Sequence, residues 1–251
     1  MIIDGHVHVT DSDYGNVDRL LLQLDASGID RAVCVPGGMI DVRQFSRVLS
    51  GKLHPDPTIR NHFVYNAIAA HPDRLYGFAC LNPHEGPAAV ATMREGFDRG
   101  CRGVKLAPLV HRVTFDLPAL AEIAEECGQR GFPVYTHVVP QPGATTVDFA
   151  ALAGRHPGTN FVLGHMGFGP GDADAIDFAA SLPNFYLETS LGNYLILGDA
   201  LAKAGAGRLV FGSEFPLSHP QVELQKILLL ESPRQDEILR GNILRLLGVE
   251  S

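Results

Sequence analysis

Met1-Ile-Ile-Asp-Gly-His-Val-His-Val-Thr10 is the stretch around which the rest of the chain is organised. Its apolar and partly β-branched residues predict a buried strand. Side chains on a strand repeat every second residue, so His6 and His8 are expected to project from the same face. Two imidazoles on one face of a buried strand need polar partners, and a divalent metal ion satisfies both rings at once. The pair therefore predicts a metal site, with two core histidines bonded to backbone carbonyls as the alternative.

Seven further apolar runs along the chain each predict another strand. They span residues 31–35, 75–81, 103–107, 133–137, 160–165, 184–190 and 208–212. Helical patterns alternate with them at residues 16–28, 57–70, 86–100, 117–130, 147–155, 172–182 and 195–204, and two more helices end near residue 247. This alternation predicts an α/β fold, a (β/α)8 TIM barrel in a single domain over residues 1–251 with two C-terminal helices. A doubly wound open sheet is the alternative, but it would not need so many evenly spaced strands.

The composition limits the classes of partner. The chain has 251 residues and a net charge of -8, with no basic run, which argues against nucleic acid or a membrane surface and leaves a small-molecule substrate. No apolar stretch approaches transmembrane length, and a strand directly after Met1 leaves no room for a signal peptide. The four cysteines show no C-x-x-C spacing, which is typical of reduced core thiols in a cytoplasmic protein. A homodimer is an assembly that the sequence leaves open.

Polar residues stand where the predicted strands end. In a barrel the chemistry lies at the C-terminal ends of the strands, so these residues are candidate ligands or catalysts. They are His6, His8, Lys105, His137, His165 and Glu214. Separate strands thus bring histidines toward one end of the barrel, and a carboxylate completes the set.

Loops at the same end supply candidates for substrate binding. They are His84, His111, Arg112 and His219, for which an ordinary solvated loop position is the alternative. His71 and His156 precede strands and are expected on the opposite face. The longest irregular stretch, residues 36–56, is unusual for a connection without a function, so we expect it to cover the substrate.

Five short motifs follow one another along the chain. They are Asp4-Gly-His-Val-His8, Gly103-Val-Lys-Leu-Ala-Pro108, Tyr135-Thr-His137, Leu163-Gly-His-Met-Gly167 and Phe211-Gly-Ser-Glu-Phe-Pro216. In this order they resemble the amidohydrolase superfamily, and most closely its amidohydrolase-2 branch, which includes aminocarboxymuconate-semialdehyde decarboxylase-like enzymes. His71-Pro-Asp-Arg-Leu-Tyr-Gly-Phe78 and Asn242-Ile-Leu-Arg-Leu-Leu-Gly248 also fit that branch, so the resemblance covers essentially the whole chain.

The resemblance implies a metal site with defined roles. His6, His8 and His137 would ligate one divalent ion, with Glu214 as a further ligand, and His165 would lie beside it as the acid/base or carbonyl-polarising group. Zinc is the expected ion, with manganese or another divalent ion as the alternative. A metal held by His and one carboxylate with an open position lowers the pKa of bound water toward about 7, and Glu214 or His165 then takes the proton.

Two residues depart from the family pattern, and a third, Lys105, has two interpretations. The family usually has Asp where this chain has Glu214; Glu is an accepted ligand in hydrolytic metal sites, so function is expected to be retained. Relatives commonly carry His where this chain has Ala107, which would alter the substrate pocket. Lys105 corresponds to a lysine that bridges two metals in some superfamily members when carbamylated. In this branch it usually is not a ligand, so one metal is expected, with Lys105 as a charge near the substrate or as a lysine reaching solvent from the strand end.

Four functions compete. The leading prediction is a metal-dependent hydrolase of a small organic amide, ester or lactone. The alternative on the same scaffold is a nonoxidative decarboxylase of an unsaturated or aromatic carboxylic acid, in which His165 moves the proton. A TatD-like phosphodiesterase fits less well, because it would want Glu where Lys105 stands and a basic binding surface. A degenerate, non-catalytic barrel is the last alternative. A purified protein that binds neither zinc nor manganese would favour it over the others.

Overall fold

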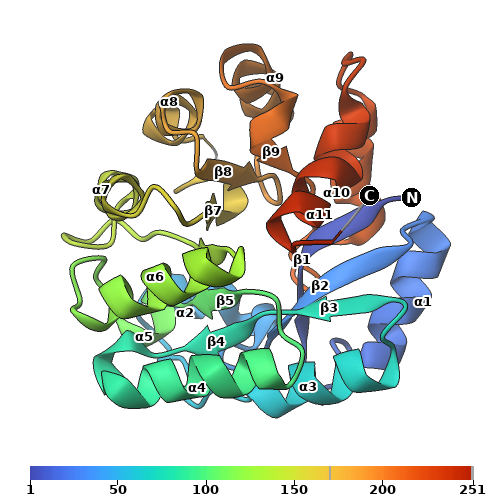
Figure 1. Cartoon of the computed structure of the whole chain (residues 1–251). Coiled ribbons are helices and arrows are strands. Elements are labelled where there is room, and N and C mark those ends of the chain that lie inside the picture. The colour runs from blue at the N-terminus through green and yellow to red at the C-terminus, as the bar shows by residue number, and fades with distance from the viewer. Residues whose placement is uncertain (170, 250–251) are drawn as a thin grey trace.

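The computed structural model of the chain describes residues 1–169 and 171–249, so Pro170, Glu250 and Ser251 of the expected domain lie outside the described residues. Helices surround a central group of parallel strands (Figure 1). The strands are β1 Ile3–Val9, β2 Arg31–Pro36, β3 Leu75–Gly77, β4 Ala79–Leu81, β5 Val104–Leu106, β6 Val134–Thr136, β7 Phe161–Leu163, β8 Phe185–Glu188 and β9 Leu209–Val210. The α-helices are α1 Val17–Ser27, α2 Phe45–Leu49, α3 Asn61–Ala70, α4 Pro87–Asp98, α5 Pro108–His111, α6 Ala119–Arg130, α7 Thr146–Arg155, α8 Ala173–Ser181, α9 Tyr194–Lys203, α10 Pro220–Leu228 and α11 Asn242–Leu246.

The strands close into a barrel. Neighbours in sequence pair in parallel from β1 to β3 and from β4 to β9. β3 and β4 are one predicted strand interrupted at Phe78, so the nine strands of the described residues fill eight positions around the barrel. The last position joins the first: the N–H of Gly5 donates to the carbonyl of Phe211, and the N–H of His8 donates to the carbonyl of Phe215, both at 2.7 Å. The predicted (β/α)8 barrel is confirmed, and the open sheet is excluded.

Two cores follow from the alternation of side chains along the strands. Residues such as Val104 and Leu163 belong to a large core that also contains the buried sides of the outer helices. The residues that alternate with them, such as Val162 and Tyr135, form a second cluster together with Ile243 of α11. Because parallel strands present alternate residues to opposite faces, the second cluster fills the barrel interior, and α11 packs against it. This apolar filling leaves the polar strand ends to form the site.

The helices mostly begin and end where the sequence predicts. Asn16 caps α1 by accepting from the N–H of Arg19, and Gly28 ends it in the left-handed conformation, at φ 69°. Asp172 caps α8, as expected. The structure differs in α3, which starts at Asn61 rather than near residue 57, and in two short helices, α2 and α5, which were not predicted. α5 is only four residues long, too short for a helical period to show in the sequence.

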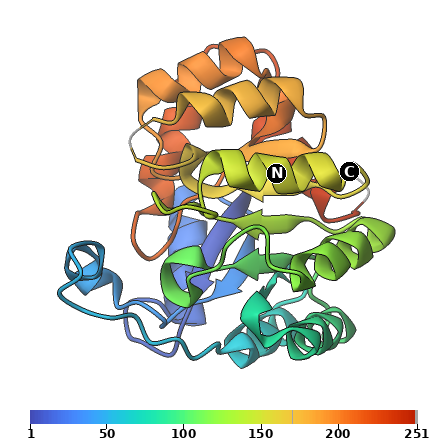
Figure 2. The same cartoon turned by 90° about the vertical axis from the view of Figure 1, so that its left-hand side faces the viewer.

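The expected irregular stretch at residues 36–56 contains a short 3₁₀ turn, Val42–Gln44, and α2. In Figure 2 this segment, in blue, projects from the body of the barrel on the same side as α5. The four cysteines are buried and free, which confirms the expected core thiols. Within the described residues, no helix combines the length and the hydropathy that crossing a membrane requires.

Candidate active site

The polar strand ends meet at one cavity. His8 lies in β1, His137 directly follows β6, and His165 follows β7. Together with Lys105 of β5 and Glu214, which follows β9, these side chains line a cavity of about 620 Å³. The sequence predicted that residues far apart along the chain would converge here, and the structure brings them to a single cavity.

Glu214 is the carboxylate around which the histidines gather. Its Oε2 lies 2.9 Å from Nδ1 of His6, and its Oε1 lies 3.3 Å from Nε2 of His8. One potential ligand atom from each of these residues lies within 4.8 Å of the others. The backbone of Glu214 has φ 59°, a conformation that a non-glycine residue adopts only when its surroundings enforce it. His6, His8 and Glu214 thus have the residue types and spacing of a divalent-metal site.

His137 lies apart from this group. It lines the same cavity, but its Nε2 accepts the N–H of Leu109, at 3.1 Å, and its ring centroid is 6.3 Å from that of His165. Among the described residues it joins no cluster of closely spaced ligand atoms. The structure therefore brings together three of the four expected ligands. The unpredicted helix α5, which carries Leu109, provides the competing donor.

Glu188 is a buried carboxylate that the sequence analysis did not single out. It ends β8 and is fully buried. Its Oε2 accepts from the hydroxyls of Tyr135 and Ser190, at 2.8 and 2.9 Å, and from the N–H of His165, at 3.2 Å. It forms a second group of potential ligand atoms with His6 and His165. An acid within a predicted apolar strand was the available signal.

Two glycines allow this network to form. A Cβ added to Gly212 would overlap the carboxylate of Glu188, and one added to Gly164 would overlap the hydroxyl of Tyr135. Both glycines belong to the motifs quoted above, directly beside the site residues. The close approach of backbone to side chain explains why glycine stands at these two positions.

The hydrogen bonds define which imidazole nitrogens carry protons. The hydroxyl of Tyr135 donates to Glu188, so its oxygen accepts from Nδ1 of His6, at 2.5 Å. In the same way Ser190 donates to Glu188 and accepts from Nδ1 of His165, at 2.8 Å. We assign the proton of each ring to Nδ1 on this basis, which leaves Nε2 of both rings with a lone pair.

Burial and charge set the protonation states. Burial lowers the pKa of His8 and of His137, and lowers that of His165 to about 4. Burial also acts to lower the pKa of His6, but the carboxylates of Glu214 and Glu188 have the larger effect and raise the pKa of this ring. Neutral imidazole is the form that binds a metal, so the histidines facing the cavity are in the required state near neutral pH.

The two carboxylates are ionised. Burial acts to raise their pKa values, but the neighbouring histidines dominate. The pKa of Glu188 falls to about 2, and that of Glu214 lies well below its usual range. Two anionic carboxylates among largely neutral imidazoles give this end of the barrel a local negative charge.

A divalent metal fits the residues present. Nε2 of His6 and Oε2 of Glu214 are buried, and within the described residues neither has a hydrogen-bond partner. Buried polar atoms rarely remain unpaired, and these two are atoms of the kinds that bind zinc or manganese. A cation bound between the ionised carboxylate and the neutral rings would satisfy both.

Lys105 is buried rather than exposed at the rim. Its side chain is 3% exposed, and its Nζ lies 4.2 Å from the ring centroid of Tyr135. Burial lowers the pKa of Lys105 to about 8. The alternative that this lysine reaches solvent is therefore wrong.

The four expected substrate residues in the loops do not line the cavity. His84 is exposed and bonds to the carbonyl of Arg112, at 3.2 Å, and His111 bonds to the carbonyl of Pro57, at 2.9 Å. His219 caps α10 by accepting the N–H of Gln221. The side chains of the three histidines hold loops and a helix end, and Arg112 does not line the cavity, so this placement gives no support to a substrate-binding role.

The wall of the cavity is largely apolar. The segment at residues 36–56 contributes Met39, Val42, Phe45 and Leu49. Ala107, which stands where relatives commonly carry His, lines the same cavity. The segment expected to cover the substrate thus supplies a large part of the apolar lining.

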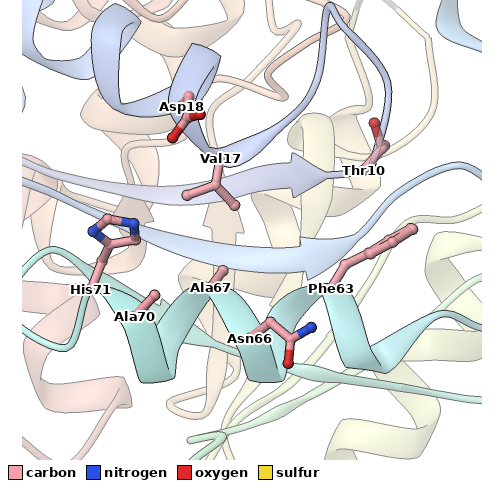
Figure 3. A pocket seen from close by; sticks show the side chains of 8 residues that line it. All are labelled: Thr10, Val17, Asp18, Phe63, Asn66, Ala67, Ala70 and His71. Carbon is pink, nitrogen blue, oxygen red and sulfur yellow. The ribbon is translucent and has the colours of Figure 1, made fainter.

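A second, smaller hollow of about 210 Å³ lies between α1 and α3 (Figure 3). Half of its lining residues are polar, with Asp18 and His71 among them. His71 ends α3, away from the cavity that His8 and Glu214 line, as the sequence predicted for this histidine. In the part of the chain that the structure describes, no group of candidate metal ligands lies in this hollow.

Comparisons with known proteins agree with this arrangement. The sequence model of a protein family described as "Amidohydrolase" matches residues 3–249. Among solved structures, an uncharacterised TIM-barrel protein from Bordetella bronchiseptica is 20% identical, covers 98% of each chain and has a TM-score of 0.76. A 2,6-dihydroxybenzoate decarboxylase from Rhizobium is 21% identical, with 98% of each chain covered and a TM-score of 0.70. A dihydroxybenzoic acid decarboxylase from Polaromonas sp. JS666 with bound manganese and an inhibitor, 2-nitroresorcinol, is 19% identical; 98% of this chain and 96% of that one are covered, and the TM-score is 0.69.

At these identities the solved structures establish the fold alone. The comparison with curated proteins found no match. The family match is of a different kind, because it spans nearly the whole chain and includes each motif described above. The protein therefore belongs to the amidohydrolase family of metal-dependent enzymes.

Proposed function

We propose that the protein is a metal-dependent hydrolase of a small organic amide, ester or lactone. The observation that carries this proposal is the position of Glu214, whose Oε2 lies 2.9 Å from Nδ1 of His6 and 3.8 Å from Nε2 of His165. One carboxylate thus touches a candidate metal ligand and faces a candidate acid/base. This arrangement suits the activation of water beside a metal.

We assign His6, His8 and Glu214 as residues that would hold the ion, with His137 as a further candidate because it lines the same cavity. The ion would be zinc or manganese, and the bound manganese of the Polaromonas relative supports the second choice. Such an ion supplies a Lewis acid, which polarises a carbonyl and makes water more acidic.

The protein's own residues would then move the proton. Oε2 of Glu214 would accept it from the attacking water. Nε2 of His165, 3.8 Å away, carries a lone pair and would pass the proton on to the leaving group. The bond from Nδ1 of His165 to Ser190, and that from Ser190 to Glu188, keep the imidazole in this tautomer and orientation.

A nonoxidative decarboxylase of an unsaturated or aromatic carboxylic acid is the second candidate. The buried ammonium of Lys105 in an apolar cavity favours it, because such a site suits an organic acid. Two of the solved structures compared above are decarboxylases by name. In this reaction Nε2 of His165, which starts with a lone pair, would first take up a proton from water and then deliver it to the carbon that loses carbon dioxide.

One experiment separates the two. Zinc-loaded and manganese-loaded protein is incubated with a panel of esters, lactones and amides and with a panel of aromatic and unsaturated acids. Ring or bond opening is followed by pH-indicator absorbance, and release of carbon dioxide by a coupled assay. Turnover of the first panel supports the hydrolase. Carbon dioxide release from the second panel, without turnover of the first, would contradict it and support the decarboxylase.

A further inference from the structure

Asp4 is a buried acid in β1 that the proposed proton transfers do not use. Its side chain is 0% exposed. Its Oδ1 accepts from the N–H of His6, at 3.1 Å, and from the N–H of Ser213, at 2.9 Å. His6 is a candidate metal ligand, and Ser213 directly precedes another, Glu214. One carboxyl oxygen therefore joins the two chain segments that bring these ligands together.

The backbone of β1 is irregular beside Asp4. β1 advances three residues, from Asp4 to Val7, while its partner β2 advances two. An extra residue of this kind forms a β-bulge, which disrupts the local ladder and turns a side chain in a new direction. The N–H of His6 lies within the bulge and donates to Asp4. Asp4 thus fixes the bulged backbone from which the ring of His6 projects.

The backbone of Glu214 is held on both sides. The N–H of Ser213 donates to Asp4, and the N–H of Glu214 itself donates to the carbonyl of His6, at 2.9 Å. The next N–H, that of Phe215, donates to Oγ of Ser213, at 3.2 Å. These bonds account for the left-handed backbone of Glu214, since a non-glycine residue keeps this conformation only where its surroundings over-determine it. The acceptor from Asp4 is a side chain of β1, so it can be removed by a substitution that leaves the backbone unchanged.

Barrel stability alone gives no reason for an acid at this position. Ile3 and Val7 in the same strand are apolar and fully buried, whereas a buried carboxyl group must give up its hydration. Burial raises the pKa of Asp4 to about 7. Oδ1 can accept both N–H groups in the neutral and in the ionised form, so the bonds to His6 and Ser213 do not depend on the charge of Asp4. The role that remains is the placement of these two N–H groups.

We propose that Asp4 is a positioning residue of the metal site, which sets the distance and direction of His6 relative to Glu214 so that both can bind one ion. Nδ1 of His6 lies 2.9 Å from Oε2 of Glu214 in this arrangement. Asp4 itself belongs to no cluster of closely spaced ligand atoms among the described residues, so it acts through the two ligands. The inference rests on the metal centre of the proposed function and names a residue that shapes it.

The test is metal binding by the whole protein. Zinc affinity is measured by competition with a zinc-binding indicator, and the visible absorption of bound cobalt(II) reports the coordination geometry. The variants are Asp4→Ala, which removes the acceptor, Asp4→Leu, which removes it at nearly the same side-chain shape, and Asp4→Asn, which keeps one acceptor oxygen.

The matched control is Asn184→Ala. Asn184 is also buried, and its Nδ2 donates to the carbonyls of Ala153, His156 and Thr159. It directly precedes β8, at the end of the barrel opposite the site, and it does not line the cavity. Its replacement therefore removes buried hydrogen bonds without touching the metal site.

Asp4→Ala and Asp4→Leu should bind zinc about 10- to 100-fold more weakly than the wild type, the loss typical of residues that orient metal ligands. Their cobalt spectra should change, because His6 and Glu214 no longer share the ion in the same geometry. Asp4→Asn should keep the spectrum and bind zinc within about threefold of the wild type, because its carbonyl keeps both bonds. Asn184→Ala should lose stability in urea and keep its zinc affinity within about twofold.

Wild-type affinity and spectrum in a folded Asp4→Ala or Asp4→Leu would overturn the inference. An equal loss of affinity in Asn184→Ala would also overturn it, because the loss would then follow from stability. A loss in Asp4→Asn as large as that in Asp4→Ala would assign the effect to charge rather than to position. Failure of both Asp4→Ala and Asp4→Leu to fold by circular dichroism would make Asp4 a residue of barrel closure and overturn the inference as well.

These outcomes are separable from those of the proposed function. A wild type that binds zinc and turns over neither panel would remove the proposed activity, while the Asp4 variants would still decide the positioning role. Hydrolysis by a protein whose zinc affinity does not depend on Asp4 would keep the activity and remove the positioning role.

Discussion

Replacing Glu188 by Gln should weaken the hydrogen bonds that hold the site residues in place. The substitution keeps the shape of the side chain and removes one acceptor oxygen and the charge. In the native protein Oε1 accepts the N–H of Ser190, at 2.6 Å, and Oε2 accepts from Tyr135, Ser190 and His165. A glutamine whose carbonyl replaces Oε2 must turn its amide toward the N–H of Ser190, which then has no acceptor.

The expected cost follows from these bonds. A buried N–H left without an acceptor costs about 1–3 kcal/mol, and the remaining bonds lose their charge-assisted part. Relief of the cost of burying a carboxylate offsets some of this loss. The lowering of the Glu188 pKa from 4.5 to about 2 corresponds to about 3 kcal/mol in favour of the ionised form. We therefore expect the free energy of unfolding to fall by about 2–4 kcal/mol.

The effect on turnover should exceed the effect of a general loss of stability. In Glu188→Gln the N–H of Ser190 loses its acceptor and the Ser190 hydroxyl donates to a neutral carbonyl, so Ser190 holds His165 less firmly. We therefore expect kcat to fall about 10- to 100-fold. The matched control is Glu223→Gln. Glu223 is also buried and accepts from Leu191 and Ser218, but it does not line the cavity.

The measurements are urea unfolding and steady-state kinetics on the metal-loaded proteins, with whichever substrate panel the wild type turns over. Glu223→Gln should lose stability and keep kcat within a factor of about two. The reasoning fails if Glu188→Gln is as stable as the wild type, or if both variants lose the same fraction of kcat.

Four further predictions follow from the same geometry. Gly212→Ala should lower the free energy of unfolding by about 1–3 kcal/mol, because its Cβ would overlap Glu188. Gly154→Ala in α7, whose Cβ would meet no atom within 4 Å, should raise the free energy of unfolding by about 0.5–1 kcal/mol. Equal effects of the two variants in urea unfolding would contradict this. His165→Ala should keep the metal and lose turnover, and loss of both in elemental analysis and kinetics would make His165 a ligand. Phe45→Ala should raise KM about tenfold with little change in kcat, because Phe45 lines the cavity without touching the polar cluster, and a fall in kcat alone would argue against this. In metal-free protein the stabilisation from ionised Glu188 should be complete above about pH 4.5 and lost as the pH falls toward 2. The difference in free energy of unfolding between the wild type and Glu188→Gln should therefore shrink between these pH values. A difference that stays constant with pH would refute this prediction.

The sequence predicted the barrel because its strands are apolar runs of regular spacing. It placed His8, His165 and Glu214 at strand ends correctly, since the end of a strand is a local feature of the sequence. It did not predict α5, and therefore not the bond from Leu109 to His137, because a single helical turn after a proline leaves no periodic pattern.

Other residues depend on contacts between distant strands. Glu188 and Tyr135 meet because their side chains face the barrel interior from β8 and β6, which are not neighbours in the sheet. Glu188 belongs to none of the quoted motifs, and in the motif of Tyr135 only His137 was given a role. His84 and His111 were placed at the correct end of the barrel, but their rings turn to backbone carbonyls that no sequence pattern reveals. Lys105 had two open interpretations, and its burial excludes the one in which it reaches solvent.

Metal content tests the central claim most directly. Wild-type protein, His8→Ala and Glu214→Ala are dialysed against zinc or manganese, freed of excess ion and analysed for metal per chain. Because His6, His8 and Glu214 lie close enough to share an ion, the wild type should hold about one ion per chain, and each variant should lose most of it while remaining folded by circular dichroism. A wild type that binds neither ion, or variants that retain the full amount, would contradict the metal centre on which the proposed function depends.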